Sequence, residues 1–147
     1  MVPASPAPTD VEIAARLRLS ATRLARRLRQ EGGGGLTPSQ LSALAAVHNN
    51  GPLTLGELAD YERVAPPTIT KCAAKLQADG LLVRSPDGTD RRVHRVSTTA
   101  AGAALIAETR RRKTTWLTQR LAALDPTERS CLAAALDALD RLCEEPR

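Results

Sequence analysis

Residues 54–98 decide the fold of this 147-residue chain, and they read TLGELADYERVAPPTITKCAAKLQADGLLVRSPDGTDRRVHRVST. The stretch opens with Thr54 and, three residues later, Glu57. Together they form a capping box, in which each side chain satisfies a free backbone N–H of the other residue. This pattern predicts a short helix over about residues 55–61. Ala59 is small enough for a second element to cross this helix closely.

A second helix is predicted from Pro66 to just before Gly80. Proline suits the first position of a helix, and glycine suits the position after its end. Apolar or small side chains recur at helical spacing and form the expected inner face: Ile69, Cys72, Ala73 and Leu76. Because each residue turns the helix by about 100°, other positions point away from the core. These outward positions are Pro67, Thr70, Lys71, Ala74 and Lys75.

After Gly80, the spacing of apolar residues changes from that of a helix to that of β-strands. Residues 81–84 and 93–96 predict two strands, and the segment 85–92 between them is rich in turn formers and charges. A capped helix, a turn, a second helix and a charged β-hairpin together predict a winged helix-turn-helix. In that arrangement the second helix enters the DNA major groove while the first supports it.

Three further capping boxes mark the starts of other helices. They are Thr9–Glu12, Thr37–Gln40 and Asp125–Glu128. Helices are predicted over about residues 10–31, 38–48, 99–123 and 126–143. The expected fold class is therefore mainly α, a six-helix winged helix-turn-helix with one two-stranded β-wing.

One compact domain with three functional parts is expected. Residues 1–9 form a flexible lead, and residues 36–98 form the winged helix-turn-helix DNA-binding region. Residues 10–35 and 99–147 form a helical dimerisation region. The apolar stripes of the first and last helices are too long for the core of one such chain to cover. We therefore expect a homodimer that forms through these terminal helices.

Charge and composition narrow the classes of partner. The net charge is +5. Residues 1–31 carry six arginines against three acids, residues 84–95 carry four against two, and residues 32–83 carry a net charge of −1. Basic charge on separate elements favours an acidic partner such as double-stranded DNA. Tyr61 and Trp116 are the only aromatic side chains, which argues against single-strand binding by base stacking.

No cofactor, metal or membrane partner is expected. Cys72, Cys131 and Cys143 form no C-x-x-C motif, so neither a disulfide framework nor a zinc site is indicated. A thiol switch at Cys72 or Cys143 stays open but is not favoured. A membrane helix needs about 18 consecutive apolar residues, and no apolar run in the sequence is nearly that long. The first residues do not resemble a signal peptide. A cytoplasmic protein is expected.

The outer face of the second helix and the hairpin supply the candidate DNA-binding residues. Threonine and lysine can donate to base edges or phosphates, and proline methylenes can contact thymine methyls. Arginines near the hairpin tip can reach a minor groove, and Asp90 can hold one of them by a bidentate pair. The candidates are Pro66, Pro67, Thr68, Thr70, Lys71, Lys75, Arg84, Asp90, Arg91 and Arg92.

Residues 54–102 resemble the winged helix-turn-helix of the MarR family of bacterial regulators. The matching stretches are Leu58-Ala59, Thr68-Ile69-Thr70-Lys71, Leu76, Asp79-Gly80-Leu81-Leu82-Val83-Arg84, Asp90-Arg91-Arg92, and Val96-Ser97-Thr98 leading to Gly102. The layout of the other helices extends the resemblance over nearly the whole chain. It implies a dimeric regulator of transcription, of the repressor kind, on a near-palindromic operator. The family's Asp-x-Arg pattern implies that Arg92 reaches the minor groove and that Arg91 lies nearer the phosphates.

Two departures from the family pattern affect the expected base contacts but not the fold. Glu62-Arg63 stands where the family usually has a Leu-Gly-like pair. A residue other than glycine in a left-handed turn costs about 1 kcal/mol, unless the turn has another shape. Ala65-Pro66-Pro67 replaces the family's serine cap, and the prolines partly offset this loss because they have no N–H to satisfy.

The resemblance also implies an effector cleft between the dimer helices and the DNA-binding lobe. Its candidate residues are Arg16, Ser20, Arg23, His48, Arg112 and Trp116. Guanidinium groups beside one large ring suit a small aromatic acid or another lipophilic effector. In the alternative interpretation, Trp116 only packs the dimer core and the arginines are solvated.

Two other function classes were weighed. An enzyme is not expected, because His48 and His94 have no nucleophile or carboxylate at a meaningful spacing and no glycine-rich phosphate loop is present. A winged-helix module that binds protein instead of DNA is the second class. The retained basic residues of the second helix and hairpin, such as Lys71 and Arg92, favour DNA.

Overall fold

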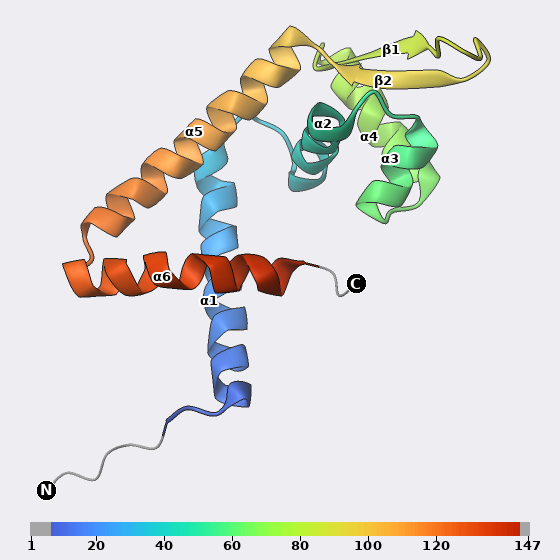
Figure 1. Cartoon of the computed structure of the whole chain (residues 1–147). Helices are drawn as coiled ribbons and strands as arrows, with labels where there is room; N and C mark the ends of the chain where they lie inside the picture. The colour runs from blue at the N-terminus through green and yellow to red at the C-terminus, as the bar shows by residue number, and fades with distance from the viewer. Residues whose placement is uncertain (1–6, 145–147) are drawn as a thin grey trace, which may run out of the picture.

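The structure is a computed structural model, and it describes residues 7–144. Six helices and one two-stranded sheet follow one another in these residues (Figure 1). In chain order they are α1 (Asp10–Gly32), α2 (Pro38–Asn50), α3 (Leu55–Glu62), α4 (Pro66–Ala78), β1 (Leu82–Pro86), β2 (His94–Thr98), α5 (Ala100–Ala122) and α6 (Pro126–Cys143). The predicted fold class is confirmed. Residues 1–6 of the predicted flexible lead lie outside the described residues.

Side-chain caps start five of the six helices. The four predicted capping boxes are all present at the starts of α1, α2, α3 and α6. Thr99 caps α5 by accepting from the amide of Gly102 at 3.1 Å. Only α4 has no side-chain cap, and prolines occupy its first positions. The capping pattern is the reason that the predicted helix ends lie within two residues of the observed ones.

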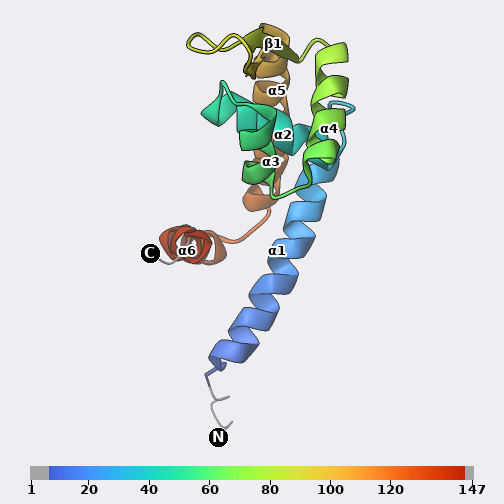
Figure 2. The same cartoon turned by 90° about the vertical axis from the view of Figure 1, so that its right-hand side faces the viewer.

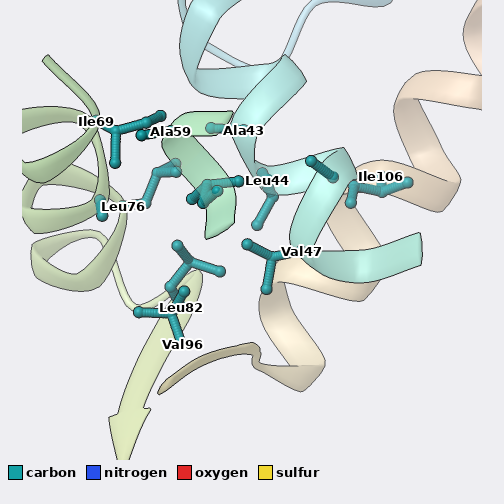
Figure 3. Packing of buried hydrophobic residues seen from close by; sticks show 12 residues of the cluster. Ala43, Leu44, Val47, Ala59, Ile69, Leu76, Leu82, Val96 and Ile106 are labelled. Atoms are coloured by element: carbon teal, nitrogen blue, oxygen red, sulfur yellow. The ribbon is translucent and has the colours of Figure 1, made fainter. Parts of the chain in front are cut away.

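Helix α2 lies at the centre of the hydrophobic core. Leu44 and Val47 on α2 are buried among side chains of α3, α4, α5 and both strands (Figure 3). Leu58, Leu76 and Val96 are also fully buried. The predicted inner face of α4 is correct at Ile69, Ala73 and Leu76, whereas Cys72 is only half-buried, at the edge of this core.

The β-hairpin is joined to the helices by backbone bonds that the sequence did not predict. Strands β1 and β2 pair antiparallel from Leu82↔Thr98 to Pro86↔His94, so both strands extend two residues beyond their predicted ends. Leu53, in the connection between α2 and α3, forms an isolated bridge with Val96. Its amide donates to the Val96 carbonyl at 3.1 Å, and the Val96 amide donates back at 2.7 Å. Besides its covalent connections to α4 and α5, the wing is therefore also held to the helices by these backbone hydrogen bonds.

Apolar side chains remain exposed on the two terminal helices. α5 runs from the wing to α6 and packs against α1 (Figure 1). α6 crosses α1 in Figure 1 but lies apart from it in Figure 2. None of the described residues of α6 is buried, and Leu132, Leu136 and Leu142 are 45%, 57% and 69% exposed.

The turn between α3 and α4 has the left-handed shape despite the absence of glycine. Arg63 has φ 53° and ψ 43°. Its amide donates to Asp60 at 3.2 Å, and the amide of Val64 donates to Ala59 at 3.1 Å. This is the hydrogen-bond pattern of a Schellman motif, which glycine usually completes.

A pair of substitutions at residue 63 isolates the cost of this backbone conformation. Arg63→Gly and Arg63→Ala both remove the side chain, but only alanine keeps a Cβ in the left-handed region. We expect the glycine variant to be more stable, with a free energy of unfolding about 1 kcal/mol higher than that of the alanine variant. Urea denaturation at one protein concentration measures the difference. Equal stabilities of the two variants would show that the turn carries no such strain.

Candidate nucleic-acid interface

The outer face of α4 is open along its length. Pro66, Pro67, Thr68, Thr70, Lys71 and Lys75 are all exposed. The opposite face is anchored in the core by Ile69, Ala73 and Leu76. Because the inner face fixes the rotation of the helix, the candidate side chains of α4 share one exposed surface.

The polar groups on this surface differ in what they can still bind. The Thr70 hydroxyl donates to the Pro66 carbonyl at 2.9 Å, so its oxygen remains an acceptor for adenine or cytosine amino groups. The Lys75 ammonium pairs with Asp79 at 2.6 Å on the same helix. Lys71 forms no ion pair within residues 7–144. Its charge is therefore available to a phosphate or a base edge.

The wing tip presents Arg92 to solvent. Its Nε donates to one Asp90 oxygen at 3.2 Å and its outer nitrogen donates to the other at 3.4 Å, so the expected bidentate pair is present. Hydrogen bonds from the Arg92 side chain, and then from its amide, lower the pKa of Asp90 and keep this carboxylate charged. The Arg92 side chain is 92% exposed, and Arg91 and Arg84 are exposed as well.

An internal ion-pair cluster, which sequence reasoning missed, supports the wing. The guanidinium of Arg95 contacts Asp87 at 2.7 Å and Glu57 of α3 at 2.9 Å. Hydrogen bonds from the Thr89 hydroxyl and from Arg95 hold the pKa of Asp87 well below its usual range. The sequence signal was weak, because Asp87 and Arg95 read as ordinary charges at the two ends of a turn.

The two elements that carry the candidate side chains lie at one end of the molecule. α4 and the wing lie at this end, opposite α6 and the first half of α1 (Figure 2). A helix with an exposed polar face can enter a major groove, and an arginine at the tip of a wing can reach a minor groove. The arrangement thus offers two contacts of different kinds to one duplex.

The candidate effector residues are not brought together in one protomer. Arg16 and Ser20 line one shallow hollow on α1, and Arg23 lines a second. His48 lines a third hollow, between α2 and the start of α5. The remaining two lie on α5, where Arg112 pairs with Glu108 at 2.8 Å and the Trp116 ring lies 5.4 Å from the Arg120 guanidinium.

The fold and the exposed basic surface define a winged helix-turn-helix DNA-binding regulator of transcription. The MarR family profile matches residues 36–94. A Mycobacterium tuberculosis HTH-type transcriptional regulator is 39% identical over 138 residues, which are 93% of this chain and 96% of that protein. The chain belongs to the MarR family.

Other relatives agree with this assignment. The crystal structure of a transcriptional regulator from Pseudomonas aeruginosa superposes with a TM-score of 0.83 at 35% identity, covering 96% of this chain and all of that one. The Bacillus subtilis transcriptional repressor MdtR is 37% identical over 68 residues, 46% of this chain and 44% of that protein.

Two other kinds of site are not found in the described part of the chain. Within residues 7–144, no helix is long and apolar enough to cross a membrane, and no group of metal-ligating side chains is found.

Two lysines on α4 provide a matched test of the helix contact. Lys71→Ala is expected to weaken operator binding by about 1–3 kcal/mol if Lys71 reads a base. Lys75→Ala removes the same charge, but Asp79 already pairs with that lysine, so its loss is expected to be smaller. Fluorescence anisotropy with a labelled operator duplex measures both variants. An equal loss of operator affinity in the two variants, or a larger loss for Lys75→Ala, would show that Lys71 is not the main contact of the helix.

Proposed function

We propose that this protein is a sequence-specific repressor that binds a near-palindromic operator as a homodimer. The exposed face of α4 enters the major groove, with Thr70 and Lys71 as the leading contacts. Arg92, held by Asp90, enters the minor groove, and Arg91 contacts phosphates. The observation that carries the proposal is that α4 and the wing lie at one end of the molecule. Lys71 of α4 forms no ion pair within residues 7–144, and Arg92 of the wing is held by Asp90 and exposed. The name of the relative MdtR supports the repressor role.

The exposed terminal helices support the homodimer. Val11, Ile13 and Leu24 of α1 are exposed, as are the leucines of α6. The two helices have net charges of opposite sign. α1 carries six arginines against three acids, and the second half of α6 carries Asp137 and Asp140 against Arg141. A second copy can cover these apolar stripes and pair these charges. A twofold dimer would place the two recognition helices roughly 34 Å apart, one turn of DNA.

Selection of bound fragments from a random duplex pool tests the operator, and sedimentation tests the dimer. The selected sites should contain two inverted half-sites about one helical turn apart. A selection that enriches single half-sites, or no sequence at all, would contradict the proposal. The wild-type protein should sediment as a dimer at micromolar concentration.

Two matched substitutions on α6 test the dimer surface. Leu136→Asp should dissociate the dimer and lower operator affinity. Ala134→Asp adds the same charge about 200° away around the helix and should do neither. Dimers that survive both substitutions would exclude α6 from the interface.

The proposal extends to release of DNA by a small aromatic acid that binds across the dimer. The six candidate residues are spread over α1, α2 and α5, so a single pocket needs the second copy to complete it. An effector releases DNA only if it favours one spacing of the recognition helices, and DNA must then weaken the effector equally. Titration with salicylate, followed by Trp116 fluorescence with and without operator, measures this. Absence of binding at millimolar salicylate, or equal salicylate affinity with and without operator, would rule out the proposed effector pocket.

Salt dependence separates DNA binding from the alternative of a protein-binding winged helix. Each phosphate that the protein neutralises contributes roughly 0.9 to the slope of log affinity against log salt. We expect a steep slope; a flat one would favour the protein-binding alternative. The proposal includes no enzymatic step and places the protein in the cytoplasm, where its DNA target lies.

A further inference from the structure

Arg95 of β2 joins the tip of its own hairpin to a segment about 40 residues earlier in the sequence, which holds the start of α3 and the connection before it. Its Nε donates to Asp87 at 2.7 Å, and one terminal nitrogen donates to Glu57 at 2.9 Å and to the Pro52 carbonyl at 3.4 Å. The Arg95 side chain is 30% exposed and that of Asp87 is 19% exposed. A planar guanidinium suits this role because its donors diverge in fixed directions.

On the helical side, Arg95 attaches to the first turn of α3. The Glu57 oxygen that receives Arg95 also receives the amide of Thr54 at 2.7 Å, within the capping box. The backbone bridge between Leu53 and Val96 lies directly beside this contact. One charged side chain therefore connects the wing to the start of the helix-turn-helix.

On the wing side, a chain of hydrogen bonds leads from Arg95 to Arg92. The second oxygen of Asp87 accepts from the Thr89 hydroxyl at 2.8 Å, the Thr89 amide at 3.2 Å and the Asp90 amide at 3.3 Å. Asp90 in turn accepts from the amide of Arg92 at 3.0 Å and from its side chain. The position of Arg92 thus depends on Asp87, and Asp87 depends on Arg95.

We propose that Arg95 is a positioning residue, which fixes the wing tip against α3 so that Arg92 is already aimed at the minor groove before DNA arrives. A two-stranded hairpin is only marginally stable by itself, so its tip needs an anchor outside the sheet. An arginine that is ordered before binding loses less conformational entropy on binding. The inference rests on the proposed contact of Arg92 with the minor groove.

The same geometry predicts a small effect of Arg95 on global stability. Glu57 is about half exposed, and ion pairs open to solvent contribute little to folding. The pair of Arg95 with Asp87 is less exposed, but it joins two residues of the wing, so its loss should loosen the wing tip first. The main hydrophobic core, including Leu58 and Val96, does not include Arg95. Loss of Arg95 should therefore change DNA recognition more than the midpoint of thermal unfolding.

A double-mutant cycle between Arg95 and Arg92 tests the proposal. Arg92→Ala, Arg95→Met and the double variant are titrated against operators with A·T-rich and G·C-rich flanks. Each single change is expected to weaken binding to the A·T-flanked operator about tenfold and to abolish the flank preference. The double variant should be no weaker than Arg92→Ala, because Arg95 acts through Arg92. Additive losses, or a preserved flank preference in Arg95→Met, would overturn the proposal.

Amide exchange in the free protein gives a readout that does not need DNA. Arg95→Met should raise hydrogen exchange at Thr89, Asp90 and Arg92 and leave the α2 amides unchanged. Arg111→Met is the matched control, since it removes one arginine paired with Glu108 on α5 and should alter neither exchange nor flank preference. Unchanged exchange at the wing tip in Arg95→Met would also overturn the proposal.

A second variant keeps the test valid if Arg95→Met unfolds. Asp87→Asn keeps the size of the side chain, removes the charge that Arg95 holds, and should reproduce both effects in weaker form. If Arg92→Ala itself has no flank effect, the proposed minor-groove contact fails, and the exchange of the wing-tip amides still decides the role of Arg95.

Discussion

The structure depends on the burial of one helix, α2, from several sides at once. Leu44 is completely buried and Val47 almost so, in contact with side chains from the helix-turn-helix, the wing and α5. Because interiors are close-packed, replacing either side chain by a smaller one would loosen the DNA-binding half and the long helix α5 together. The same core also fixes the inner face of α4 through Ile69 and Leu76, and so determines which residues of α4 are exposed.

Local chemistry was enough to predict the elements but not their long-range contacts. Capping boxes and prolines fixed the helix starts, since those interactions span three residues. The bridge between Leu53 and Val96 and the pair between Arg95 and Glu57 join residues 43 and 38 positions apart, and no local pattern indicates them. Of the predicted DNA-binding side chains, those of α4 and the wing tip lie on one end of the molecule, but their contacts with DNA remain predictions. The candidate effector residues line separate hollows in the single chain. In the proposal, they form one cleft only when a second copy of the chain is present.

The turn before α4 shows how a fold tolerates a departure from its family's pattern. Arg63 adopts the left-handed conformation, so the backbone path is kept at a cost of about 1 kcal/mol. At the start of α4, Pro66 and Pro67 have no N–H, so two of the free backbone donors of the first turn are absent and need no cap. The departures change side chains in the turn and at the start of α4, whereas the packing of α3 against α4 depends on the buried core.

A single residue joins the wing to the helices that the proposal assigns to effector binding. Thr99 separates the end of β2 from the start of α5, and its hydroxyl donates to the Gly80 carbonyl at 2.6 Å while its amide donates to Leu81 at 3.1 Å. A side chain at Gly102 would collide with the carbonyl of Leu81, so α5 begins in close contact with the connection between α4 and β1. This junction leaves little freedom for α5 to move independently of the recognition helix and the wing. In the proposed mechanism, an effector that changes the packing of α5 against α1 would therefore also shift α4 and the wing, which is the physical requirement for it to control DNA binding.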